Sequence, residues 1–296
     1  MTALSAPPRE NKAAGILLVL AGTGLMTAMD GVAKFLVGAD LSVFQILAVR
    51  GWFVIPVLLL WLPRAGGRAA LKTKRLGGHL LRACFGILTP IFFFTGLKVL
   101  PLADAVAIFY GAPFIMTALS VPLLGERVGY HRWAAVVVGF VGVLIVTQPG
   151  SGAFQPAALL MVGASISYAL LMLSGRLLGR TESVFLMILF FNVCTAVSAT
   201  LVLPFVWKPM AYEHVAAAAA MAALTIAGHI CLTKAFVIAP ISVLTPFKYG
   251  ALIWAALIGF VFWGDIPGKW VLVGAAVIAG SGLYMAHRES LVKKKK

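Results

Sequence analysis

The sequence has very few charged residues for its length. Only 11% of its 296 residues are Asp, Glu, Lys or Arg, whereas soluble domains carry about 25%. Apolar side chains make up 61% and the mean hydropathy is +1.02. This composition excludes a soluble globular enzyme and a disordered chain, and it predicts an integral membrane protein. Since one span needs about 20 apolar residues, ten spans would use about 200 and leave no room for a separate soluble domain.

Cysteine is also scarce, and the familiar enzyme signatures are missing. The three cysteines, Cys84, Cys194 and Cys231, lie in apolar runs without a CxxC or Cys/His spacing, which argues against a disulfide scaffold and a metal site. There is no GxxxxGK[ST], H-E-x-x-H or G-x-S-x-G motif, so neither ATP hydrolysis nor an intramembrane enzyme is expected. No cofactor and no metal ligand is predicted.

Apolar runs that are broken by charge, Pro or Gly predict ten transmembrane helices. Their ranges are 13–37, 42–63, 77–98, 101–124, 131–148, 156–178, 184–206, 213–237, 241–263 and 269–287. Pro101 and Pro240 predict breaks where two runs almost touch, because proline lacks a backbone donor and clashes with the preceding turn. Residues 1–12 are interpreted as a polar cytoplasmic tail and not as a cleavable signal. Residues 288–296 are interpreted as a basic cytoplasmic tail, and both a lipid-facing and an added Lys293–Lys296 segment stay open.

Basic residues are distributed unevenly between the two ends of these spans. The net charge of +15 would indicate nucleic acid in a soluble protein, but here it fits short loops near anionic lipid, so no nucleic-acid partner is predicted. The side that carries both chain ends holds 17 of the 24 basic residues: Arg9, Lys12, Arg64, Arg68, Lys72, Lys74, Arg75, Arg82, Arg127, Arg132, Arg176, Arg180, Arg288 and Lys293–Lys296. The other side holds Lys34, Lys98, Lys208 and Lys269. The positive-inside rule therefore predicts a multi-pass inner-membrane protein with both termini in the cytoplasm.

The two halves of the chain align when they are shifted by 139 residues. Pro101 then meets Pro240, Tyr110-Gly111 meets Tyr249-Gly250, and Gly125-Glu126 meets Gly264-Asp265. This indicates two five-helix repeats, 13–148 and 156–287, and the odd number of spans makes them inverted. The predicted fold is an all-α integral membrane protein with ten transmembrane helices as two inverted five-helix repeats. Secondary transporters use this architecture and bind substrate near the midplane.

At these residues the chain resembles the drug/metabolite transporter superfamily, in its ten-helix EamA-type form. The resemblance is carried by the segment LKVLPLADA at 97–105, Pro113 and Gly125-Glu126-Arg127, and in the second half by Lys234-Ala235-Phe236, Ala239-Pro240, Tyr249 and Gly264-Asp265. The second half departs from the Gly-Glu-Arg pattern at Ile266. The resemblance implies a metabolite transporter that works by alternating access. Relatives carry amino acids, riboflavin, S-adenosylmethionine, carboxylates, purines or nucleotide sugars, in either direction.

Ionisable and aromatic residues inside the spans are the candidates for the functional site, because a charge at the bilayer centre costs about 3 kcal/mol or more. The substrate-binding candidates are Arg50, Lys248, Lys234, Tyr110, Tyr249 and Phe109. The candidates for proton coupling or gating are Asp30, His229 and Asp104.

Each candidate also has a purely structural interpretation. Asp30 can pair with Lys34 one turn away, and Arg50 can form a permanent bridge to Asp30 or Asp104. Asp104 can stabilise a helix start, Lys234 can snorkel, His229 can pack by a local hydrogen bond, and tyrosines can simply pack.

The excess of buried positive charge predicts a small-molecule substrate with a carboxylate or phosphate, or a zwitterion such as an amino acid. Its transport would be proton-coupled or run by exchange. The alternatives are an efflux pump for organic cations and a non-transporting sensor or scaffold. Lipid is the other expected partner, and such a chain can work as a monomer.

Overall fold

The computed structural model describes residues 11–67, 71–73, 75–126, 128–151, 154–179 and 181–293, without the side chains of 241, 242 and 289–293. The described residues form these helices: α1 (Lys12–Gly38), α2 (Val43–Trp61) with the 3₁₀ turn η1 (Leu62–Ala65), α3 (Leu76–Leu97), α4 (Leu102–Phe109), α5 (Ala112–Leu124), α6 (Tyr130–Thr147), α7 (Ala157–Leu178), α8 (Val184–Val206), α9 (Tyr212–Ile238), α10 (Ile241–Lys248), α11 (Gly250–Trp263) and α12 (Lys269–Lys293). Several basic residues of the charge count lie outside the described residues: Arg9, Arg68, Lys74, Arg127, Arg180 and Lys294–Lys296.

Ten of the resulting segments are long and apolar enough to cross a membrane, which confirms the ten predicted spans. The fourth span combines α4 and α5, and the ninth combines α10 and α11. One boundary is wrong: α12 continues to Lys293, so residues 288–293 of the predicted tail are helical. The segment from 288 to 293 contains no Gly or Pro that would end the helix.

The chain breaks at both predicted prolines. Pro101 and Pro240 occupy the N-cap positions of α4 and α10, directly after the turns that end α3 and α9. A second kind of break was not predicted. The fourth and ninth spans are each interrupted in the middle, at Tyr110-Gly111 and at Tyr249-Gly250.

A proline lies near each interruption. Pro113 lies in the first turn of α5 and Pro246 lies inside α10, and neither residue has a backbone N–H to continue the helical ladder. At the first interruption, the carbonyl of Ile108 accepts from the backbone N–H of Gly111 at 2.9 Å. The hydroxyl of Ser165 on α7 donates to the carbonyl of Met161 in its own helix at 2.9 Å, and its oxygen lies 3.3 and 3.4 Å from the carbonyl oxygens of Ile108 and Phe109.

The ends of α5 and α11 also correspond, 139 residues apart. Gly125 and Gly264 both adopt left-handed conformations, with φ of 66° and 69°. The next backbone N–H groups, those of Glu126 and Asp265, donate to the carbonyls of Ser120 and Gly259. Both helices therefore end in the same Schellman-type motif, which places an acidic side chain just beyond each helix.

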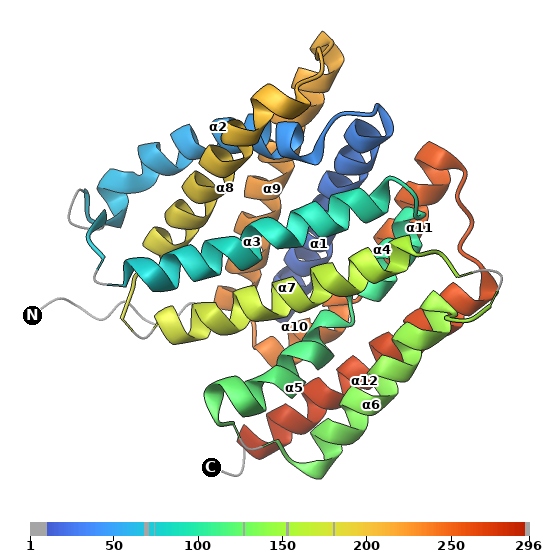
Figure 1. Cartoon of the computed structure of the whole chain (residues 1–296). Coiled ribbons are helices and arrows are strands. Elements are labelled where there is room, and N and C mark those ends of the chain that lie inside the picture. Colours follow the sequence, from blue (N-terminus) through green and yellow to red (C-terminus); the bar gives the residue numbers. More distant parts are fainter. Residues whose placement is uncertain are drawn as a thin grey trace, which may run out of the picture.

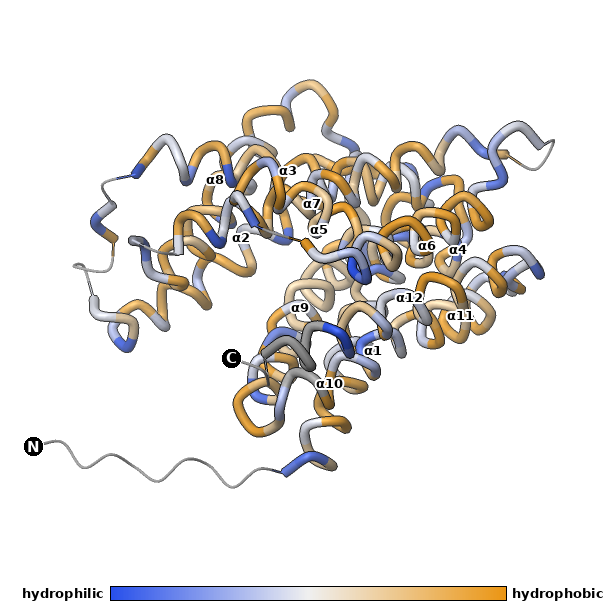
Figure 2. Tube along the Cα trace, turned by 90° about the horizontal axis from the view of Figure 1, so that it is seen from below, coloured by the Kyte–Doolittle hydropathy of each residue, from blue (hydrophilic) through white to orange (hydrophobic). Residues whose placement is uncertain are grey.

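Helices from the two halves of the chain pack against each other (Figure 1). The main pairs are α1 with α9, α3 with α7, α2 with α8 and α6 with α12. In the last pair, a Cβ added at Gly274 would lie 2.7 Å from the carbonyl oxygen of Gly142, so only glycine allows these backbones to approach this closely. Hydrophobic residues line the spans, and hydrophilic residues gather at the connections and helix ends (Figure 2).

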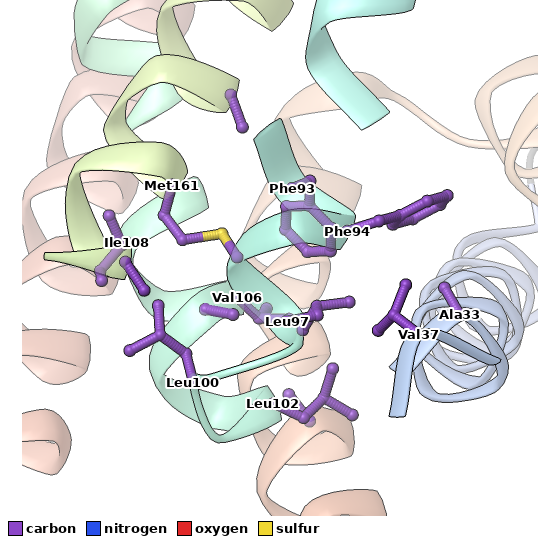
Figure 3. Close-up of a cluster of buried hydrophobic side chains, with 14 of the residues drawn as sticks. Ala33, Val37, Phe93, Phe94, Leu97, Leu100, Leu102, Val106, Ile108 and Met161 are labelled. Carbon is purple, nitrogen blue, oxygen red and sulfur yellow. The ribbon is translucent and has the colours of Figure 1, made fainter. Parts of the chain in front are cut away.

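The largest buried cluster joins α1, α3, α4 and α7 (Figure 3). Ala33 and Val37 of α1 face Phe94 and Leu97 of α3, close to the turn that leads through Leu100 into α4. This end of the spans also carries Lys34, and we call it the Lys34 end. The opposite end carries Arg176, in the last turn of α7, and we call it the Arg176 end.

Candidate functional site

The two interrupted spans meet at their breaks. The rings of Tyr110 and Tyr249 lie with their centroids 5.5 Å apart. The Tyr110 hydroxyl donates to the carbonyl oxygen of Lys248 at 2.9 Å. The hydroxyl of Tyr249 lies against Gly282 of α12, where a Cβ would overlap with it. The structure therefore brings together two predicted site residues from opposite halves of the chain.

Aromatic rings continue from this contact toward α3 and α7. The Phe109 ring lies 5.2 Å from that of Tyr168 on α7 and 5.0 Å from that of Phe93 on α3. Phe109 precedes Tyr110 at the break, so the two groups of ring contacts are neighbours along the chain. We call Phe93, Phe109, Tyr110, Tyr168 and Tyr249 the aromatic wall. Such a wall offers flat apolar faces with polar hydroxyl tips.

A pair of opposite charges lies near the tyrosines. Asp30 of α1 and Arg50 of α2 interact electrostatically, and Asp30 also interacts with the hydroxyl of Tyr110. Arg50 is only 9% exposed, and Asp30 is half-buried. Neither side chain forms a hydrogen bond or a direct ion pair with a described residue. The predicted permanent bridge between Arg50 and Asp30 or Asp104 is thus not formed within the described part of the chain.

The three remaining candidates on α9 and α10 are exposed. The ammonium of Lys248 lies 6.0 Å from the centre of the Phe236 ring, so it is the backbone of Lys248 and not its charge that contacts Tyr110. His229 contacts the carbonyl of Thr225 at 2.8 Å, one turn earlier in α9. Lys234 also lies on α9, and the structure brings neither Lys234 nor His229 into contact with the tyrosine pair.

The expected pairing of Asp30 with Lys34 is wrong. Lys34 forms its ion pair with Asp265, at 2.9 Å, and donates to the carbonyl of Leu100 at 3.1 Å. Asp104 interacts electrostatically with both members of this pair. Asp104 therefore belongs to a charged cluster at the Lys34 end and not to the central site. Lys34 therefore pairs with Asp265, 231 positions further along the chain, and not with Asp30 one turn away in its own helix.

Another charged cluster lies at the same end, outside the spans. Asp40 accepts hydrogen bonds from Lys208 and from Lys98, the latter at 2.6 Å. The hydrogen bonds from Lys208 and Lys98 lower the pKa of Asp40 to about 2. The three residues line a cavity of about 400 Å³ together with Val37, Leu41, Ser42, Val43, Phe94, Thr95 and Val206.

Arg82 is a residue whose place the sequence analysis missed. It was counted with the basic residues at the helix ends, but its guanidinium donates to the carbonyl of Leu171 on α7, and its Nε is buried without a hydrogen bond among the described residues. Arg82 also interacts with Tyr168, which connects it to the aromatic wall. Its depth in the apolar run was a signal, since it follows Leu76 at the start of α3 by six residues.

The described residues contain no group of three His, Cys, Asp or Glu side chains that could hold a metal ion. The central site presents opposite charges, hydroxyl groups and aromatic rings.

Comparisons with known proteins agree with a transporter. A profile of the EamA-like transporter family matches residues 13–148. An S-adenosylmethionine uptake transporter of Rickettsia bellii is 28% identical over 277 residues, which cover 91% of this chain and 92% of that protein. A riboflavin transporter of Rhizobium johnstonii is 30% identical over 234 residues, which cover 77% of this chain and 76% of that protein.

A pseudopaline exporter of Pseudomonas aeruginosa is 23% identical over 269 residues, which cover 89% of this chain and 93% of that protein. One crystal structure matches 94% of this chain and 99% of its own, with a TM-score of 0.61 and 18% identity, so it shares the fold.

Proposed function

The chain belongs to the EamA-like transporter family, and from this premise we propose a secondary active transporter for a small zwitterionic or carboxylate-bearing metabolite. Transport by a multi-pass protein of the bacterial plasma membrane follows from the relatives and the ten spans. The substrate class, the direction and the energy source are the proposed part.

One observation carries the substrate class: Asp30 and Arg50 are opposite charges at the central site, and neither has a hydrogen-bond partner among the described residues. A substrate carboxylate would give the planar Arg50 guanidinium two parallel hydrogen bonds, and a substrate ammonium would pair with Asp30. Hydrogen bonds to charged groups contribute about 1.5–3 kcal/mol each. An α-amino acid group fits both charges at once.

The aromatic wall supports a substrate that also has a flat ring. Phe109, Tyr110, Tyr168 and Tyr249 could stack against a purine or a flavin. S-adenosylmethionine carries an α-amino acid group and an adenine ring, and it is therefore the first compound to test. Riboflavin has the ring without the amino acid group, so it separates the two contributions.

The internal symmetry supports alternating access. Broken spans, tyrosines and helix ends recur 139 residues apart, as expected for two inverted repeats whose exchange of conformations opens the site to each side in turn. With both termini in the cytoplasm, the Lys34 end is periplasmic. The energy comes from protons or from exchange, and the proton-carrying candidates are Asp30, His229 and Asp104.

Substrate binding is tested by thermal stabilisation of the purified protein. A ligand that binds only the folded state raises the melting temperature. At a ligand concentration of 100 times the Kd, the free energy of unfolding increases by about 2.7 kcal/mol. The shift in melting temperature caused by S-adenosylmethionine, riboflavin and free amino acids would be measured for the wild type, Arg50→Gln and Asp30→Asn. Phe53→Leu is the matched control, because Phe53 is 42% exposed on α2 three residues after Arg50.

Three outcomes separate the candidate functions. Stabilisation by amino acid compounds that Arg50→Gln abolishes supports the proposal, and uptake into proteoliposomes then gives the direction. Stabilisation by organic cations alone, lost in Asp30→Asn but kept in Arg50→Gln, would replace it with a cation efflux pump. Binding without any flux in proteoliposomes would indicate a sensor.

A further inference from the structure

The helices around the central site form two groups. In one group, α1 packs against α9, α10 and α11, and in the other, α7 packs against α3, α4 and α5. We call them the α1 group and the α7 group. Each contains the 139-residue counterparts of the other, since α1 corresponds to α7, α9 to α3, α10 to α4 and α11 to α5.

The two groups meet in the centre at the Tyr110–Tyr249 contact, and away from it their described helices pack closely on each other at one end only. At the Lys34 end, α1 packs on α3 and α4 packs on α11. The corresponding pairs at the Arg176 end, α7 with α9 and α5 with α10, make no comparable packing among the described residues. Leu102 is fully buried at the start of α4. A Cβ added at Gly259 of α11 would lie 3.8 Å from the Cβ of Leu102. These contacts between helices seal the structure at the Lys34 end. Leu100 and Leu102 at this end belong to the buried cluster drawn in Figure 3.

A charged cluster spans this seal. Asp265 and Lys34 belong to the α1 group, and their ion pair is largely enclosed, with side chains 28% and 13% exposed. Leu100 and Asp104 belong to the α7 group. The ammonium of Lys34 crosses the seal to the Leu100 carbonyl, and Asp104, in the first turn of α4, interacts electrostatically with both members of the pair.

The charges of this cluster do not balance. The charged groups that interact with Asp104 are Asp265, beside α11, which repels its ionised form, and Lys34, on α1, which attracts it. With both carboxylates ionised, the cluster carries one net negative charge, and Asp104 is repelled across the seal. A single proton on Asp104 makes the cluster neutral and removes that repulsion.

At the Arg176 end, Glu126 and Arg176 form the corresponding acid–base pair at 3.2 Å, but both side chains are about half exposed, at 42% and 53%. A second pair at this end, His79 with Glu182 at 3.4 Å, is buried, with side chains 0% and 6% exposed. The counterpart of Asp104 in the second half is Val243, so only the first half has a carboxyl group at this position.

We propose that Asp104 is a proton-binding site that controls the seal at the Lys34 end: the seal closes when Asp104 holds a proton and opens when Asp104 is ionised and repelled by Asp265. This rests on the proposed transporter function and assigns the coupling proton to one of its candidate carboxylates. It makes exposure of the substrate site at the Lys34 end dependent on pH.

The seal can be measured without any substrate, through a thiol placed inside it. In a background of Cys84→Ser, Cys194→Ser and Cys231→Ser, Leu102→Cys puts a reporter thiol in the seal. Its labelling by a maleimide in nanodiscs, where both membrane faces are accessible, is followed from pH 5.5 to 8.5. Each rate is divided by that of the denatured protein at the same pH, which removes the ionisation of the thiol itself. We expect the corrected rate of the reporter protein to rise about tenfold with pH.

Two isosteric substitutions should keep the seal closed throughout this range. Asp104→Asn removes the charge that repels Asp265. Asp265→Asn leaves Lys34 as the charged partner of Asp104. In both variants the corrected labelling rate should stay low and change less than twofold from pH 5.5 to 8.5. If the Lys34–Asp265 pair only held the seal shut, Asp265→Asn would instead raise labelling at every pH, and that result would overturn the proposal.

Two further variants complete the test. Asp104→Glu should keep the pH dependence, and Glu126→Gln, at the other end, should leave it unchanged. A pH dependence that persists in both Asp104→Asn and Asp265→Asn, or that disappears in Glu126→Gln, would refute the assignment. Since no substrate takes part, these results stay separate from success or failure of the substrate proposal.

Discussion

The Asp30–Arg50 pair allows its structural contribution to be separated from its role in transport. We consider three variants: Asp30→Asn, Arg50→Gln and the double variant. Arg50 is 9% exposed, and each residue is the charge that offsets the other across α1 and α2. Removing one charge leaves the other uncompensated in a spanning helix, whereas removing both leaves two polar amides.

The expected magnitudes follow from the cost of a lone charge in a membrane span. Each single variant should lose about 2–3 kcal/mol of stability, which corresponds to a fall in melting temperature of roughly 5–10 °C. The double variant should lose less than either single variant, because replacing a whole buried ion pair is often nearly neutral. Transport of the proposed substrate should be lost in all three.

The assay is thermal unfolding of purified protein in one detergent, combined with uptake into proteoliposomes. The coupling between the two substitutions is the difference between the double variant and the sum of the singles. If the losses of the single variants simply add in the double variant, the two charges do not compensate each other. The interpretation of the site as a matched bipolar pair would then be wrong.

Three further predictions concern the contacts around this site. Tyr110→Phe loses the hydrogen bond to the Lys248 carbonyl and should cost about 0.5–1.5 kcal/mol in thermal unfolding; Tyr212→Phe, at an 89% exposed tyrosine, is its control and should cost nothing. Gly274→Ala presses a Cβ to 2.7 Å from the carbonyl of Gly142 and should cost about 1–3 kcal/mol. On the same helix, Gly280→Ala meets no atom within 4 Å, and an equal loss there would contradict the packing argument. Because the hydrogen bonds from Lys208 and Lys98 lower the pKa of Asp40 to about 2, its stabilising effect is complete above its ordinary pKa and is lost only as the pH falls through about 2. The difference in melting temperature between wild type and Asp40→Asn should therefore stay constant from pH 8 to 5, and a difference that fades over this range would show that Asp40 is not held by these lysines.

The partner of Lys34 shows what helical spacing can and cannot predict about ion pairs. Asp30 and Lys34 share a helix face, and this spacing is sufficient for a pair in an isolated helix. In the folded chain Lys34 is bound by Asp265, which the helix end at Gly264 presents to α1. Sequence separation gave no means of ranking these two partners, because their competition is decided by how α1 packs against α11.

The interrupted spans show a similar limit. Pro101 and Pro240 marked breaks between helices, since proline acts on the backbone at its own position. The interruptions at Tyr110 and Tyr249 coincide with Pro113 and Pro246, but whether a proline kinks or ends a membrane helix depends on what satisfies the freed carbonyls. At the first interruption the Ile108 carbonyl accepts from the backbone N–H of Gly111, and the hydroxyl of Ser165, 57 residues away in sequence, lies 3.3 Å from it.

The sequence by itself determined the membrane environment, the ten spans, the places where they begin and the family, because these depend on hydropathy, length and local turn chemistry. Only the tertiary structure decided where two charges are bound: Lys34 by Asp265, and Arg82 by a carbonyl of α7 in place of the membrane surface. It also decided that, among the described residues, the α1 group and the α7 group pack closely at the Lys34 end and not at the Arg176 end. Two halves of similar sequence can form either arrangement, and the choice depends on contacts between helices that no single helix encodes.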